Sequence, residues 1–159
     1  YYSNHPDSRL LLLGYHDNPY GRKIRDLINE LNLNNSVIFC GQISHDKMRD
    51  YFNLCDVAVS LPFSDGSPAS LVELQACGKP IIAGYNNSIN EIISDGKNGF
   101  LIDCEDASKL SSSLSWLFDN ILEYDKMVNY IHENNSTNSS LTNCRTMIEV
   151  YSSVLTAKS

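Results

Sequence analysis

The hydrophobic positions of this chain follow two patterns in turn, short continuous apolar runs and longer stretches with helical spacing. Residues 9–15 (RLLLLGY) form an apolar run of the kind that is buried on both faces of a parallel sheet. Residues 21–33 instead place apolar side chains at three- and four-residue steps, which is typical of an amphipathic helix. The start of the chain therefore predicts a buried strand followed by a helix.

The same alternation continues to residue 118. Further strands are predicted at residues 36–41, 56–61, 80–83 and 100–102, and further helices at residues 45–55, 69–77, 88–94 and 106–118. The short helix at 88–94 begins with Ser88 and Glu91, which have the spacing of a capping box. Short connections between alternating strands and helices imply parallel strands joined by right-handed crossovers. The predicted fold class is α/β, a Rossmann-like doubly wound parallel sheet with helices on both faces.

The composition changes after residue 128. Residues 129–143 are rich in Asn and Ser and predict a polar connector of loop or frayed helix ends. Helical spacing then returns at Cys144, Ile148, Tyr151 and Leu155. A chain of 159 residues with 42% hydrophobic residues can fill one core. We therefore assign residues 1–128 to a Rossmann-like domain and residues 129–159 to a connector and a C-terminal helix that packs back on it.

Charge and cysteine content exclude several functions. Nineteen acidic against twelve basic residues give a net charge of −7, which argues against binding nucleic acid or an anionic membrane through a basic surface. No apolar run approaches the length of a membrane span. The five cysteines are widely separated and odd in number, which favours reduced thiols, and no Cys-x-x-Cys or His-x-x-x-His spacing indicates a metal site. Any anion must therefore be held by local features.

Residues 64–80 (SDGSPASLVELQACGKP) contain the strongest candidate site. Asp65 and Glu73 lie eight positions apart across a glycine-containing turn and the start of a predicted helix. In a doubly wound sheet, ligands bind beyond the carboxyl ends of the strands, which selects the loops after Gly14, Gly41 and Leu61. These loops are expected to lie together.

The turn and helix start in this segment are suited to a diphosphate. The first turn of a helix has unpaired N–H groups, so donors could come from Gly66 and Ser67 and from the helix start at residues 69–71, which are Ala69, Ser70 and Leu71. Glu73 could accept two hydrogen bonds from a ribose diol. Ordinary helix capping and a solvated helix glutamate explain the same residues without a ligand, and the spacing alone leaves both interpretations open.

This segment resembles the donor-binding signature of the retaining GT-B glycosyltransferases of group 1, the family four type, found in bacterial capsule and O-antigen biosynthesis. That signature usually has two glutamates with this spacing, followed by Ala-(small)-Gly-x-Pro, and residues 76–80 (ACGKP) fit it. The resemblance extends over roughly residues 10–118. It implies that Glu73 contacts the donor ribose and that Asp65, as the catalytic position, contacts the transferred sugar. The shorter Asp departs from the usual Glu, which leaves the sugar contact open.

The resemblance also implies a reaction. The parent enzyme would transfer a hexose or N-acetylhexosamine from a UDP-sugar, or less readily mannose from GDP-mannose, to a cell-surface glycan such as lipopolysaccharide or to a lipid-linked acceptor. It would retain the anomeric configuration without a metal or other cofactor. Gly14 and Gly41 would border the nucleotide. The expected location is cytoplasmic, including the inner face of the cytoplasmic membrane.

GT-B enzymes have two such domains, and this chain resembles only the C-terminal, donor-binding one. The expected partner is an N-terminal acceptor domain of the same polypeptide, which would also make any membrane contact. The chain also lacks the family's basic pair, an Arg and a Lys upstream that neutralise the diphosphate, so the chain alone is expected to be inactive. The alternative is a non-catalytic Rossmann-like nucleotide-binding module or partner subunit. The length of the native reading frame would separate the two.

Overall fold

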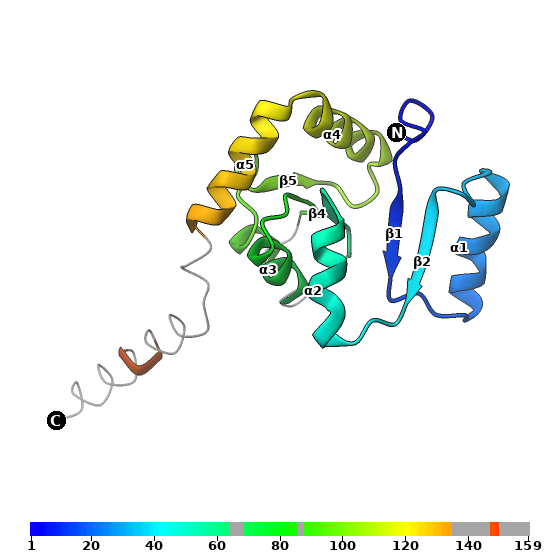
Figure 1. Cartoon of the computed structure of the whole chain (residues 1–159), viewed down its shortest axis with the longest axis horizontal. Helices are drawn as coiled ribbons and strands as arrows, with labels where there is room; N and C mark the ends of the chain where they lie inside the picture. The colour runs from blue at the N-terminus through cyan, green and yellow to red at the C-terminus, as the bar shows by residue number, and fades with distance from the viewer. Residues whose placement is uncertain (64–68, 86–87, 135–146, 150–159) are drawn as a thin grey trace.

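The chain forms parallel strands covered by helices, as the alternating pattern predicts (Figure 1). The computed structural model describes residues 1–63, 69–85, 88–134 and 147–149. The strands are β1 (Leu10–Leu13), β2 (Val37–Gly41), β3 (Ala58–Ser60), β4 (Ile81–Gly84) and β5 (Gly99–Ile102). The helices are α1 (Pro19–Glu30), α2 (His45–Leu54), α3 (Ala69–Ala76), η1 (Ile89–Glu91), α4 (Ala107–Asp119) and α5 (Ile121–Asn134). The predicted α/β, Rossmann-like class is confirmed.

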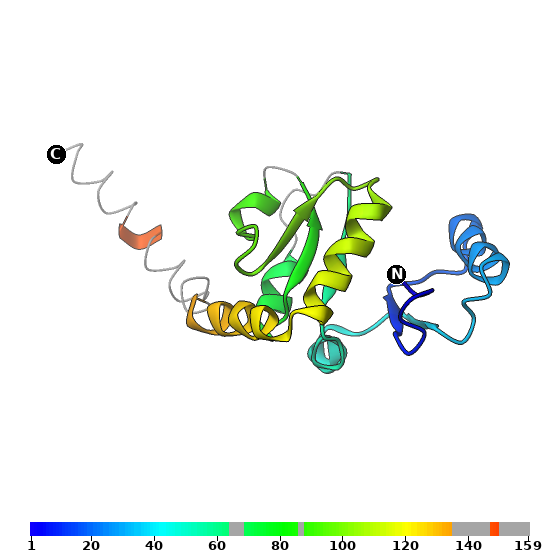
Figure 2. The ribbon, with the colours of Figure 1, turned by 90° about the horizontal axis from the view of Figure 1, so that it is seen from above.

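The strands belong to two hydrogen-bonded groups where the sequence predicted one sheet. β1 pairs in parallel with β2, and β3, β4 and β5 pair in parallel in that order. In the part of the chain that the structure describes, β1 is not paired with β3. Figures 1 and 2 both place β1, β2 and α1 to one side of the remaining elements. Hydrophobic periodicity reports which faces of a strand are buried and not which strand is its neighbour, so this division was not predictable from it.

Helices cover both faces of the three-stranded sheet. Ile81 and Ala83 of β4 point into one hydrophobic cluster, with Phe52 of α2 and Leu71 of α3. Ile82, between them in sequence, points into the other cluster with Leu117 of α4. Successive side chains of a strand face opposite sides, so the two clusters lie on the two faces of the sheet. This arrangement is the doubly wound one.

The N-terminal turn packs on α4. The rings of Tyr1 and His5 stack with centroids 4.2 Å apart, and Tyr1 also lies 6.3 Å from the ring of Phe118. His5 Nε2 is 3.5 Å from the hydroxyl of Ser115. These contacts connect the start of the chain to the larger sheet's helical cover, although β1 itself pairs only with β2 among the described strands.

One local prediction is wrong, and one helix was missed. The segment from Ser88 to Ser94 contains only the 3₁₀-helix η1, and the Ser88 side chain makes no capping hydrogen bond. The sequence analysis did not predict α5, which continues through residues 129–134, where it expected loop or frayed helix ends. Met127 and Ile131 of this helix are buried four positions apart, and their spacing is masked by the surrounding polar residues.

The boundary between residues 128 and 129 stays a prediction, although α5 crosses it. The predicted last helix lies outside the described residues except at residues 147–149, which are helical. Within the described ranges, no helix combines the length and the apolar composition needed to cross a membrane.

Candidate functional site

Two glycine loops lie side by side where β1 and β2 end. Gly14 has φ +74° and Gly41 has φ +64°, values that glycine adopts without strain. The amide of Gly14 donates a hydrogen bond to the carbonyl oxygen of Gly41 at 2.8 Å. Beside them, Gln42 Nε2 lies 3.5 Å from His16 Nε2. The structure therefore brings the loops that contain the predicted site residues Gly14 and Gly41 into direct contact.

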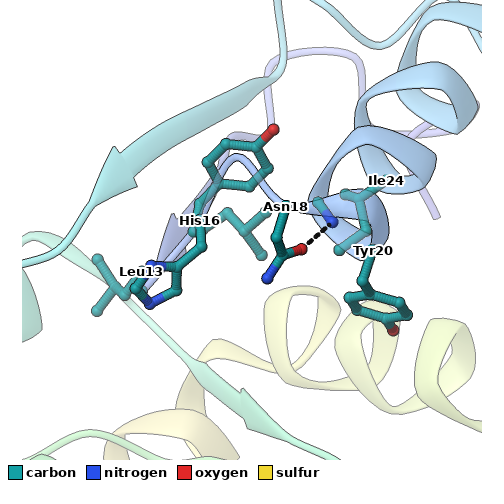
Figure 3. Close-up of a pocket in the computed structure, with 9 residues that line it drawn as sticks. Leu13, His16, Asn18, Tyr20 and Ile24 are labelled. Carbon is teal, nitrogen blue, oxygen red and sulfur yellow. Dashed lines mark hydrogen bonds between the residues drawn. The ribbon is translucent and has the colours of Figure 1, made fainter.

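A cavity of about 170 Å³ lies beneath the Gly14 loop, between β1 and the start of α1 (Figure 3). Its apolar wall includes Leu13 and Ile24, and its polar groups come from His16, Asn18 and Tyr20. Pockets for complete drug-sized ligands span roughly 300–1,000 Å³. This cavity is therefore large enough for one part of a nucleotide ligand and too small for the whole.

The loop that follows Gly14 is held in place by contacts with the start of α1. The side-chain oxygen of Asn18 accepts a hydrogen bond from the amide of Gly21 at 2.8 Å, which caps the helix (Figure 3). Gly21 itself is buried, and a Cβ there would lie 2.0 Å from the carbonyl oxygen of His16. Only glycine allows the loop to lie this close to the helix, so the shape of the cavity depends on Gly21.

The start of α3 divides its first residues between the surface and the core. Ala69 and Ser70 are exposed, whereas the side chain of Leu71 is fully buried in the cluster with Phe52. The binding role predicted for these three residues depends on their backbone N–H groups, which the burial of a side chain does not exclude. The remaining predicted residues of this segment, Asp65, Gly66 and Ser67, lie outside the described residues.

Glu73 lies close to the start of α2, the helix that follows β2. Its Oε1 lies 3.9 Å from Nδ1 of His45, the first residue of α2, with 39% of the Glu73 side chain and 87% of the His45 side chain exposed. Such an exposed pair contributes little to stability, because water screens it. The carboxylate therefore stays available to a ligand, at a point between α3 and the start of α2.

His45 was not among the predicted site residues. His45 is exposed, and its ring faces the candidate carboxylate. Its position four residues after Gly41, at the start of the helix predicted at residues 45–55, was the available signal. A contact across 28 positions in sequence cannot be derived from spacing alone.

Cys55, which directly follows α2, has a packing role and not a reactive one. Burial raises the pKa of the Cys55 thiol, and the charge of Lys79 opposes that shift only in part. Cys55 therefore stays a neutral thiol near pH 7, packed against the cluster with Phe52. Among the residues that the structure describes, no group of three or more His, Cys, Asp or Glu side chains could hold a metal ion.

The family of this chain follows from a match that covers most of it. The family of glycosyl transferases group 1 matches residues 2–134, and the chain belongs to this family. Among curated proteins, it is 26% identical over 121 residues to a D-inositol 3-phosphate glycosyltransferase of Paenarthrobacter aurescens. That alignment covers 76% of this chain and 30% of the relative.

Two solved structures share the fold. The HepE protein of Anabaena, solved in complex with UDP, matches with a TM-score of 0.84 and 21% identity over 93% of this chain and 42% of that one. The C-terminal domain of the group 1 glycosyl transferase LpcC from Francisella tularensis matches with a TM-score of 0.77 and 19% identity, over 86% of this chain and 72% of that one. These likenesses show the fold of a GT-B glycosyltransferase domain.

This chain is short beside its relatives. It spans only 19% to 32% of the length of the curated relatives that it matches. The chain therefore corresponds to only a part of those proteins.

Proposed function

We propose that this chain is the donor-binding domain of a glycosyltransferase and that it holds a nucleotide sugar at the carboxyl ends of its strands. The observation that supports this most directly is the meeting of Glu73 with His45, which lies beyond the end of β2. The loops of Gly14 and Gly41 are joined by a backbone hydrogen bond at the same edge. Ligands of doubly wound sheets bind at this edge.

Each group has a separate role in the proposal. The carboxylate of Glu73 accepts hydrogen bonds from the two ribose hydroxyls of the donor. The N–H groups of Ala69, Ser70 and Leu71, at the start of α3, face the diphosphate, where the positive end of the helix dipole favours negative charge. The cavity beneath Gly14 and the polar groups of His16 and Gln42 border the nucleotide.

UDP-sugars are the proposed donors, with GDP-mannose as the second choice. The Anabaena HepE protein, which shares the fold, was solved with UDP and with UDP-glucose. The proposed acceptor is a cell-surface glycan or a lipid-linked sugar of a bacterial polysaccharide pathway, held by a second domain of the same polypeptide at the cytoplasmic membrane face. The names of the relatives differ: several are D-inositol 3-phosphate glycosyltransferases, and one is an alpha-monoglucosyldiacylglycerol synthase.

The proposed reaction retains the anomeric configuration and needs no metal. Helix N–H groups and basic side chains of the longer polypeptide stabilise the departing diphosphate, in the manner of an oxyanion site. Asp65 contacts the transferred sugar and faces the positive charge that develops at its anomeric carbon. The chain alone binds the donor weakly and does not catalyse transfer.

Binding is tested by titrating the chain with UDP, GDP, UDP-GlcNAc, UDP-GalNAc and GDP-mannose and following backbone NMR shifts. We expect shifts around Gly14, Gly41 and residues 69–73 with one nucleotide series. Loss of a charge-assisted hydrogen bond costs about 1.5–3 kcal/mol, so Glu73→Ala should weaken binding by about tenfold or more.

Glu30→Ala is the matched control, because Glu30 is an exposed glutamate at the far end of α1. It should bind as the unmodified chain does. Equal binding by the Glu73 variant would exclude the ribose role of Glu73. If neither this chain nor the full-length polypeptide shows shifts at millimolar nucleotide, the proposed donor site is wrong.

A further inference from the structure

The carboxylate of Glu73 brings negative charge to a site that must accept a diphosphate. In the part of the chain that the structure describes, its ion-pair partner is His45 of α2, and no lysine or arginine pairs with it. The chain as a whole has a net charge of −7. A nucleotide sugar adds further negative charge through its diphosphate. The charge of Glu73 therefore opposes the ligand that its hydrogen bonds would hold.

The lysines and arginines in the first turns of the helices do not approach this carboxylate. Arg22, in the first turn of α1, pairs with Asp17 at 3.7 Å. Lys109, in the first turn of α4, belongs to the helix on the opposite face of the sheet from α3. Lys47 follows His45 by two positions, about 200° around α2, so it projects from the other side of that helix. His45 is therefore the side chain that can place positive charge beside this carboxylate.

His45 and Glu73 meet between two helices that cover the same face of the sheet. His45 is the first residue of α2, and its Nδ1 lies 3.9 Å from Oε1 of Glu73 in α3. Both helices pack on one hydrophobic cluster, α2 through Phe52 and α3 through Leu71. The imidazole is the more exposed of the two groups. It can therefore adjust to a bound ligand while the helices keep their positions.

The proposed diphosphate position lies within range of the Glu73 charge. The diphosphate faces the N–H groups at the start of α3, and Glu73 follows Ala69 by four positions, about 6 Å along the helix axis. Salt at physiological ionic strength screens exposed charges over about 8 Å, so it does not remove this repulsion. A positive charge on His45 would offset it. The carboxylate could still accept the ribose hydroxyls, because its two oxygens have about four acceptor positions.

We propose that His45 compensates the charge of Glu73 when its ring is protonated, so that the chain binds a nucleotide diphosphate sugar more tightly as the pH falls. The inference rests on the proposed donor site. His45 acts through Glu73 and is therefore a positioning residue. Histidine side chains change charge between pH 5 and 8. Over this range carboxylates and the diphosphate of a UDP-sugar stay ionised, so the change in affinity comes from histidine.

The other charged groups near His45 have to be separated from it. Glu73 faces it from α3. The charged neighbours on α2 itself keep their charge over this pH range: Asp46, Lys47 and Arg49. At the same edge of the sheet, His16 lies beside Gln42 in the loops after β1 and β2. Since His16 titrates in the same range as any histidine, the experiment has to distinguish the two rings.

The test is the affinity of the chain for UDP-glucose at about pH 5.5 and about pH 8, measured by NMR titration. We expect binding about two- to fivefold tighter at the lower pH, the range of an exposed ion pair. His45→Gln removes the charge and should remove this gain. His45→Lys is charged at both pH values and should bind at pH 8 as tightly as the unmodified chain does at pH 5.5.

Two controls separate the charge of His45 from other effects of pH. Uridine has no phosphate, so its binding should show no gain at the lower pH. His132→Gln is the matched variant: His132 is an exposed histidine on α5 that lies over Gly78, at the other end of α3 from the proposed diphosphate position. It should keep the full gain with UDP-glucose.

Several results would overturn the proposal. Tighter binding at the higher pH would mean that the protonated ring competes with the ribose for Glu73. A gain that persists in His45→Gln and disappears in His16→Gln would assign the effect to His16. Equal affinity at both pH values would refute this inference and leave the donor site standing. Absence of binding at millimolar UDP-glucose, in this chain and in the full-length polypeptide, would reject the donor site and this inference together.

Discussion

The β1–α1–β2 region and the β3–β5 region are built from the same kinds of elements but are buried to different degrees. In the larger region, Ile81, Ile82 and Leu117 are completely buried. In the smaller region, Leu27 of α1, Leu31 directly after α1 and Ile38 of β2 are exposed. The smaller region nevertheless supplies both glycine loops and the cavity of the candidate site. Part of the proposed site therefore lies in the region whose apolar side chains are less buried.

The largest contrast is expected from truncating an isoleucine in each region. Ile82→Ala removes a fully buried side chain from the cluster with Leu117 and should lower the free energy of unfolding by about 2–5 kcal/mol. Ile38→Ala changes an exposed side chain and should cost less than about 0.5 kcal/mol. Urea denaturation of the 159-residue chain measures both. Equal losses would mean that the two regions are equally well packed.

Gly99 in the larger region and Gly14 in the smaller region also differ in their surroundings, although Gly21 of the smaller region is as closely packed as Gly99. A Cβ at Gly99 would lie 1.9 Å from the carbonyl oxygen of Ile81, so Gly99→Ala must push β4 and β5 apart and should cost about 3 kcal/mol. A Cβ at Gly14 meets nothing within 4 Å, and only its φ of +74° opposes alanine, at about 1–2 kcal/mol. Thermal and urea unfolding test this order. The reverse order would mean that the backbone strain at Gly14 outweighs the clash at Gly99.

A smaller effect is expected where α5 is attached to the larger sheet. The hydroxyl of Tyr124 donates to the carbonyl oxygen of Asp56 at 2.9 Å, and Tyr124→Phe should cost about 1 kcal/mol. Burial, aided by the charge of Asp56, raises the pKa of Tyr124. The phenol is then more easily deprotonated in the unfolded chain, so this contribution is complete below about pH 10 and is lost above it. A pH-independent difference between the two proteins up to pH 11 would contradict this.

The smallest effect is expected in the smaller region. The guanidinium of Arg25 lies 4.7 Å from the ring of Phe39 and 5.2 Å from that of Tyr15. Arg25→Met keeps much of the aliphatic contact and removes the charge, so it should cost about 0.5–1 kcal/mol. Arg22→Met is the control, since Arg22 is an exposed α1 arginine beside Asp17. A loss of stability no larger than that of the control would mean that the contacts of Arg25 with these two rings do not stabilise β2.

Much of the fold could be predicted because apolar patterns are local. The run at residues 9–15 is β1 with its closing glycine, and the helix predicted at residues 69–77 is α3, followed by Gly78 with φ +73°. The patterns did not predict an element whose burial depends on contacts with residues far away in sequence. In α5, a polar surface hides the spacing of Met127 and Ile131, whose burial depends on packing against distant elements.

The candidate site was predictable only in part. Glycines with positive φ at the ends of β1 and β2 follow from strand termination, and the sequence analysis selected both loops. The hydrogen bond between them and the contact of Glu73 with His45 depend on how elements far apart in sequence are placed. The roles of Asp65, Gly66 and Ser67 stay predictions, because these residues lie outside the described residues.

The hydrogen bond from Gly14 to Gly41 has an evolutionary consequence. Both partners are main-chain atoms, so no neighbouring side chain is needed to hold the two loops together. His16 and Gln42 can therefore be replaced in descendants of this protein while the loop geometry is inherited unchanged. We expect sequence divergence to concentrate at these two positions and to spare the two glycines, so that related proteins change what they recognise without rebuilding the scaffold.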